Sequence, residues 1–135
     1  KETSKKHYFT DNGLLSVFLT ENYAPLLENL CAITLYKQYN KDAGTPRLYY
    51  YNRNVEVDFF VPDECVAIQA SYSINDHETR RRETTALVAL NKLYPLKKAL
   101  VVTYDEEEVI EMDGLTIEVV PVWKWLLCDS NTDKC

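Results

Sequence analysis

The fold of this chain is decided by residues 47–72, which read RLYYYNRNVEVDFFVPDECVAIQASY. Three runs rich in aromatic and β-branched residues follow one another here, separated by short polar breaks: Arg47–Tyr51, Val55–Val61 and Cys65–Tyr72. These runs predict three consecutive strands. Because side chains alternate along a strand, we expect Val57 and Phe59 on one face of the middle strand and Asp58 on the other.

Helical patterns lie on either side of these strands. Pro25 suits the first turn of a helix, and a broad apolar stripe follows it and ends near Tyr39. From Asp76 to about Tyr94 apolar residues recur at three- and four-residue intervals, and Asn75 or Asp76 can cap this helix. Near the N-terminus, residues 6–10 predict a short strand and residues 14–19 a short helix.

The C-terminal third predicts one buried strand, a hairpin and a short helix. Residues 99–104 form an apolar run typical of a strand buried on both faces, and Asp113-Gly114 is a hairpin turn signal. Pro121 begins the last helix. The order predicts a single three-layer α/β/α domain with a mixed central sheet, a C-terminal hairpin and a short helix. Its expected core includes the following residues: Val57, Phe59, Ile68, Leu90 and Val101.

Length and composition agree with one domain over residues 1–135, with residues 129–135 frayed. Apolar residues make up 46% and charged residues 27%, as in globular proteins. No stretch is long and apolar enough for a membrane span or a signal peptide, so we expect a cytoplasmic protein without a membrane partner. Because the chain begins with Lys1 rather than Met, we expect it to be a processed or trimmed part of a longer protein.

Charge and cysteine spacing restrict the possible sites. The net charge of −6 argues against general nucleic-acid binding, although Arg80-Arg81-Arg82 could contact a phosphate locally. The four cysteines and two histidines do not have zinc-ligand spacing. Ten tyrosines are many for this length, and a strand through Tyr49-Tyr50-Tyr51 must turn at least one ring away from the core unless Tyr50 packs under a helix.

Four short strings occur in an order and at separations that carry a resemblance: Asp11-Asn12-Gly13-Leu14-Leu15, Leu27-Glu28-Asn29-Leu30, Tyr49-Tyr50-Tyr51 and Glu56-Val57-Asp58-Phe59. With the element order, they resemble the domain of unknown function that follows the P-loop module in bacterial and archaeal AAA-type ATPases. The resemblance implies a restriction-endonuclease-like fold of the PD-(D/E)xK nuclease superfamily.

The same resemblance implies a degenerate nuclease-like site. Glu28 would match the helix glutamate, Asp58 the metal-binding aspartate, and Gln69 the acidic or Gln position of the third strand. Ser71 then stands in the place of the catalytic lysine. Glu56 is expected to share a face with Asp58, so these two carboxylates could bind Mg²⁺ weakly. Arg53 and the Arg80 cluster could supply a cation only if the fold brings them near.

Phosphodiester hydrolysis by this superfamily needs carboxylates for a metal ion and a cation beside the reacting phosphate. Gln69 is a weaker ligand than a carboxylate, and Ser71 cannot replace a lysine. We therefore expect a catalytically inactive, accessory domain that contacts a protein or nucleic-acid partner. Two alternative functions stay open: a nuclease with a substituted site, and a purely structural or oligomerising domain. Asp58 and Gln69 could also be structural residues held by hydrogen bonds.

ATP binding is not expected in this chain, because no P-loop string occurs among its three glycines. The resemblance assigns ATP hydrolysis to a module upstream, and the upstream ATPase module is then a partner in the same chain. No cofactor is expected in residues 1–135, except Mg²⁺ if the domain is nuclease-active.

Overall fold

The computed structural model describes residues 6–8, 10–11, 23–40 and 47–129. Within these residues, six strands form one sheet with the order β1-β2-β3-β4-β6-β5. The strands are β1 (Tyr49–Asn52), β2 (Glu56–Val61), β3 (Val66–Ala70), β4 (Lys98–Thr103), β5 (Glu108–Met112) and β6 (Leu115–Pro121). The β3–β4 and β4–β6 pairs are parallel, and the other three pairs are antiparallel. The sheet is mixed, as predicted.

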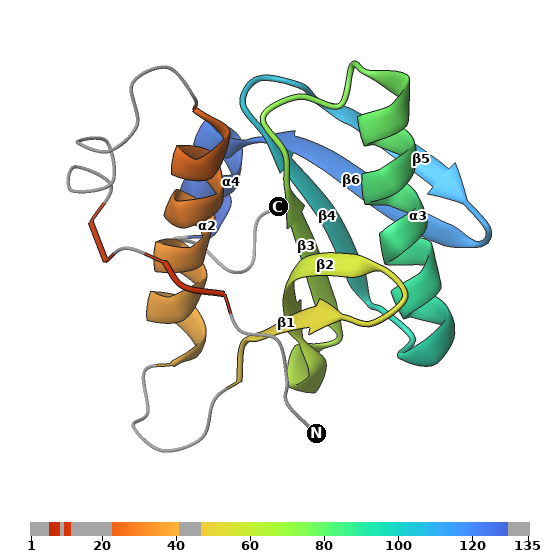
Figure 1. Ribbon diagram of the computed structural model, residues 1–135, viewed down its shortest axis with the longest axis horizontal. Coiled ribbons are helices and arrows are strands. Elements are labelled where there is room, and N and C mark those ends of the chain that lie inside the picture. The colour runs from red at the N-terminus through yellow and green to blue at the C-terminus, as the bar shows by residue number, and fades with distance from the viewer. Residues whose placement is uncertain (1–5, 9, 12–22, 41–46, 130–135) are drawn as a thin grey trace.

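Helices cover both faces of the sheet (Figure 1). α3 (His77–Leu93) covers one face, and α2 (Ala24–Tyr39) and α4 (Val122–Asp129) lie on the other. The core therefore consists of an α3-side cluster and an α2-side cluster. The predicted core residues are all at most 2% exposed, which confirms the three-layer α/β architecture: Val57, Phe59, Ile68, Leu90 and Val101.

Local sequence signals explain where the elements begin and end. Asp76 caps α3 by accepting the backbone N–H of Thr79 at 2.9 Å, a contact typically worth about 1 kcal/mol. The β5–β6 turn places Asp113 and Gly114 at φ 48° and 79°, the left-handed region that the hairpin requires. Between β2 and β3 the chain makes a short 3₁₀ turn, η1 (Pro62–Glu64).

The structure differs from the sequence prediction near the N-terminus. Lys6 to Tyr8 belong to no strand, so the prediction of a strand over residues 6–10 is wrong for these residues. Residues 6–8 instead contact the rest of the domain through their side chains. The Tyr8 ring, for example, lies 5.8 Å from the ring of Phe59. The predicted helix over residues 14–19 and residues 130–135 lie outside the described residues. Across the described part of the chain, no helix combines the length and apolarity needed to cross a membrane.

Candidate functional site

β2 carries one extra residue where the candidate site begins. Tyr49 pairs with Phe60. Two residues further on, Tyr51 pairs with Val57, so two steps along β1 face three steps along β2. Because of this β-bulge, Val57 and Phe60 pack on the α3 side whereas Phe59 packs on the α2 side. The predicted placement of Val57 and Phe59 on one face is therefore wrong. Bulges re-aim side chains and are common beside functional sites.

Asp58 lies inside this bulge and has a cation as neighbour. Its Oδ2 accepts the backbone N–H of Ala70 at 2.9 Å, and its Oδ1 accepts a hydrogen bond from Lys6 Nζ at 2.9 Å. The same ammonium donates to Oε1 of Glu28, on α2, at 2.9 Å. The side chains of Lys6, Glu28 and Asp58, here called the carboxylate–lysine cluster, are 24%, 29% and 13% exposed. The fold thus brings Glu28 and Asp58 together, as the resemblance implies, but with a lysine between them.

The remaining neighbours of Lys6 also favour a cation. The ring centroid of Tyr50 lies 4.4 Å from Lys6 Nζ, a cation–π distance, and the Tyr50 hydroxyl donates to the Glu56 carboxylate. Burial lowers the Lys6 pKa, but Asp58 and Glu28 raise it by more, so the net shift is upward. Lys6 is therefore a permanent positive charge between two acidic side chains.

Gln69 has a structural role at the bulge. Its Oε1 accepts the backbone N–H of Asp58 at 2.9 Å, and its Nε2 donates to the backbone carbonyls of Glu56 and Glu83 at 2.9 and 3.4 Å. The side chain is buried. The amide therefore ties β3 to the backbone of the bulged segment of β2 and to α3, and its oxygen already accepts one hydrogen bond.

The other residues considered from sequence bond to partners outside the cluster, although Glu56 accepts the hydroxyl of Tyr50, whose ring lies against Lys6. Ser71 Oγ donates to the carbonyl of Ser73 at 3.0 Å, Arg80 pairs with Glu108, and Arg82 pairs with Glu83. Within the described residues, no hydrogen bond or ion pair joins Ser71, Glu56 or these arginines to Glu28 or Asp58. In the same part of the chain, no three His, Cys, Asp or Glu side chains converge as metal ligands.

The sequence matches, over residues 23–125, the family described as Domain of unknown function (DUF4143). The chain belongs to this family. No curated protein and no solved structure matches it. The region matched to DUF4143 contains Glu28, Asp58 and Gln69 but begins after Lys6, so the cation of the cluster comes from outside that region.

The tyrosines of β1 in this DUF4143 domain have three different environments. Tyr50 lies under the Lys6 ammonium, and Tyr51 packs against the α3-side cluster. Tyr49 is the exposed ring, with 48% of its surface accessible. One ring is therefore turned away from the core, as expected, and Tyr50 packs against a lysine.

Two acidic side chains of the DUF4143 domain have raised pKa values. Burial raises the pKa of Glu83 from 4.5 to about 7, and the nearby Asp58 charge adds to this shift. Burial also raises the pKa of Glu28, while its hydrogen bond from Lys6 lowers it and the Asp58 charge raises it again. Sequence reasoning missed Glu83, because an acid that follows three arginines reads as part of a solvated helix face.

We expect the domain to lose stability as pH rises through the pKa of Glu83. A carboxyl group with a raised folded pKa binds more protons in the native state than in the unfolded state between pH 4.5 and about 7. Its stabilising contribution is therefore present below that window and is lost above it. Relative to Glu83→Gln, the natural domain should lose on the order of 2 kcal/mol between about pH 5 and about pH 8.

Urea denaturation of both proteins at the two pH values measures this difference. Arg82→Gln is a useful control, because it removes the partner of Glu83 and should widen the pH dependence. Parallel stability curves for the natural domain and Glu83→Gln would contradict the assignment.

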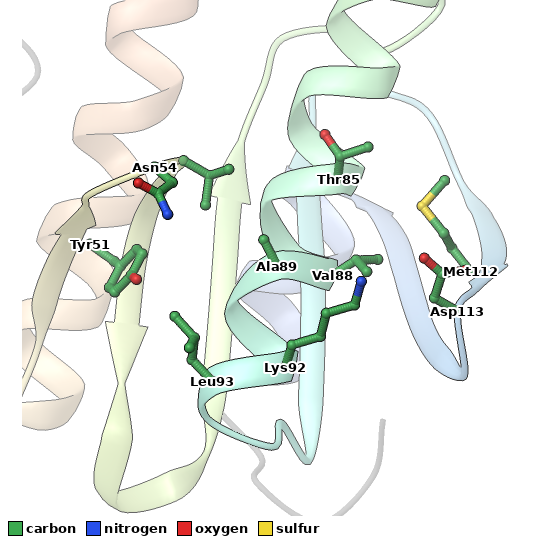
Figure 2. A pocket seen from close by; sticks show the side chains of 10 residues that line it. Tyr51, Asn54, Thr85, Val88, Ala89, Lys92, Leu93, Met112 and Asp113 are labelled. Atoms are coloured by element: carbon green, nitrogen blue, oxygen red, sulfur yellow. The ribbon is translucent and has the colours of Figure 1, made fainter.

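A separate hollow of about 420 Å³ lies on the α3 side, between the β1–β2 hairpin, α3 and the β5–β6 turn. Figure 2 shows Lys92 and Leu93 projecting from α3, Met112 from the end of β5 and Asp113 from the turn. No member of the carboxylate–lysine cluster lines it. Its charged lining residues are Lys92 and Asp113, which no hydrogen bond or ion pair joins in the described part of the chain, whereas the cluster holds three charged side chains in direct contact.

Proposed function

We propose that this chain is an accessory, non-hydrolytic domain with a restriction-endonuclease-like fold, joined to the ATPase module of a prokaryotic AAA-type protein, and that it acts by binding a macromolecular partner. The observation that carries the proposal is the position of Lys6. Its ammonium lies 2.9 Å from both Glu28 and Asp58, where a nuclease of this superfamily would need its carboxylates free for a metal ion.

The residues at the site do not fit a catalytic Mg²⁺. Both Asp58 oxygens accept hydrogen bonds, one from Lys6 and one from the Ala70 N–H, and the Gln69 oxygen accepts the Asp58 N–H. A divalent cation would have to displace the Lys6 ammonium, which carries the same charge sign and already contacts both carboxylates. The ammonium thus supplies the compensating charge that Mg²⁺ would otherwise provide.

The alternative function is a nuclease in which Lys6 replaces the lysine missing at position 71. It is favoured by one observation, the ion pair of Lys6 with Asp58. In that case Lys6 would have to stay close to Asp58 while releasing Glu28 to a metal ion.

A cleavage assay separates the two functions. We expect no cleavage of supercoiled, linear or single-stranded DNA, or of RNA, in Mg²⁺ or Mn²⁺ by the natural domain. The loss of one charge-stabilising contact in a transition state costs about a hundredfold in rate, and here both the third-strand acid and its lysine are replaced. Ser71→Lys combined with Gln69→Glu tests whether restored charges confer activity.

Asp58→Ala is the control for contamination. Cleavage by the natural domain that Asp58→Ala lacks would reject the non-hydrolytic function, and a further loss in Lys6→Met would support the nuclease. The ATPase setting is tested separately by the gene sequence upstream of Lys1, where a P-loop is expected.

A further inference from the structure

Three exposed tyrosines from separate elements form one continuous aromatic surface. Tyr23 precedes α2, Tyr72 follows β3 and Tyr104 follows β4. The start of α2 and the ends of β3 and β4 lie toward the top of Figure 1. The Tyr23 and Tyr72 rings stack at 6.2 Å with 25° between their planes. The Tyr72 and Tyr104 rings meet edge to face at 5.0 Å. Tyr23, Tyr72 and Tyr104 are here called the tyrosine patch.

The patch is held in place by the sheet but does not belong to the core. The backbone N–H of Tyr104 donates to the carbonyl of Tyr72 at 3.0 Å, and Ser71 N–H donates to Val102 at 2.9 Å, so the parallel pairing of β3 and β4 continues to the patch. The three rings are 62%, 41% and 47% exposed. Adjacent exposed aromatic rings on fixed backbone are typical of interaction sites, because they provide contact area at little cost in conformational entropy.

The segment that follows Tyr104 in the patch is acidic, with the sequence Asp105-Glu106-Glu107-Glu108. Asp105 follows Tyr104 and makes no ion pair with any described residue. Next to it, Glu106 accepts the backbone N–H of Ile74 at 3.0 Å, while Glu107 and Glu108 pair with Lys124 and Arg80. Partial burial raises the pKa of Tyr72, and the neighbouring Tyr104 and Asp105 raise it further.

Electron-rich ring faces and an uncompensated carboxylate both attract cations. Tyrosine rings can also stack on nucleobases, but such sites hold the phosphate backbone with basic side chains. Here Arg80 is already paired with Glu108, and the acidic residues exceed the bases. The surroundings of the patch therefore favour a basic partner over a polyanion.

We propose that the tyrosine patch docks a basic segment of a protein partner, with an arginine or lysine side chain stacked on the tyrosine rings and its charge facing Asp105. This inference rests on the proposed function of the domain as a binding module and names the chemistry of its partner. It uses a surface separate from the carboxylate–lysine cluster, so the two can be tested independently.

The test measures binding of a fluorescent peptide of alternating arginine, lysine and glycine by anisotropy. The natural domain should bind it, Tyr72→Ala and Tyr104→Ala should weaken binding about tenfold each, and Asp105→Asn about threefold. Tyr36→Ala is the matched control: Tyr36 is 62% exposed on α2, as Tyr23 is before it, and its substitution should leave binding unchanged. Far-UV circular dichroism confirms that each variant is folded.

The tyrosine variants retain the net charge of the domain, so equal binding by Tyr72→Ala and the natural domain would indicate non-specific charge attraction and overturn the proposal. Absence of peptide binding would also overturn it. Binding of a thymidine oligonucleotide that Tyr72→Ala abolishes would assign the patch to nucleic acid instead, and self-association lost in that variant would assign it to a second copy. None of these results alters the cleavage assay, which tests the proposed function separately.

Discussion

Replacing Gln69 with methionine is expected to lower the free energy of unfolding by about 3 kcal/mol. Methionine fills a similar volume but cannot satisfy the buried Asp58 N–H or the carbonyls of Glu56 and Glu83, which the Gln69 amide contacts at 2.9 to 3.4 Å. An unsatisfied buried polar group costs about 1–3 kcal/mol, and at least two are created here. Urea denaturation measured by circular dichroism gives the difference directly.

The matched control is Gln38→Met on α2. The Gln38 amide oxygen is buried and has no hydrogen-bond partner among the described residues. Its removal should therefore leave stability unchanged or raise it. If Gln38→Met and Gln69→Met had the same effect, the loss could be assigned to the residue type, and the structural role of Gln69 at the bulge would be wrong.

The three-layer fold was predictable because several local signals agree. A broad apolar stretch that begins at a proline marks α2, helical spacing marks α3, an apolar run marks β4, and Asp113-Gly114 marks the β5–β6 turn. These signals act over short distances in the chain, so each element can be recognised from its own residues. When the local preferences of most segments agree with the fold, the fold can be predicted from sequence.

The bulge in β2 was not predictable, because β2 is apolar on both faces. Val57, Phe59 and Phe60 can all be buried with or without an extra residue, so hydrophobic alternation does not fix the register. The sequence contained one indirect signal, a glutamine in an otherwise apolar strand. Its amide groups required partners, and the bulge provides them.

The carboxylates of the site were predictable, but their cation was not. The resemblance placed Glu28 and Asp58 together, and it left the position of the missing lysine charge open. Lys6 is 22 residues from Glu28 and 52 from Asp58 along the chain, and nothing in its own neighbourhood distinguishes it from other lysines. Only a buried pair of acids lacking a counter-charge could have suggested such a partner.

Replacing Lys6 with methionine is expected to lower the free energy of unfolding by about 2–3 kcal/mol at neutral pH. The methylene packing is largely retained, but Glu28 and Asp58 are left close together without a counter-charge. Without the Lys6 hydrogen bond the pKa of Glu28 should rise further, so the variant takes up a proton on folding and regains stability as pH falls. Urea denaturation at neutral and mildly acidic pH measures both effects.

Two comparisons separate charge compensation from a general effect of losing a lysine. Lys124→Met removes an exposed lysine paired with Glu107 and should cost less than about 1 kcal/mol. Adding Glu28→Gln to Lys6→Met should restore most of the lost stability, because one of the two uncompensated charges is then gone.

Excess Mg²⁺ should raise the melting temperature of Lys6→Met more than that of the natural domain, because the two carboxylates no longer contact an ammonium and can attract a metal ion. If the double variant were as unstable as Lys6→Met and Mg²⁺ affected neither protein, Lys6 would contribute packing alone, and the domain would need no cation between its two carboxylates.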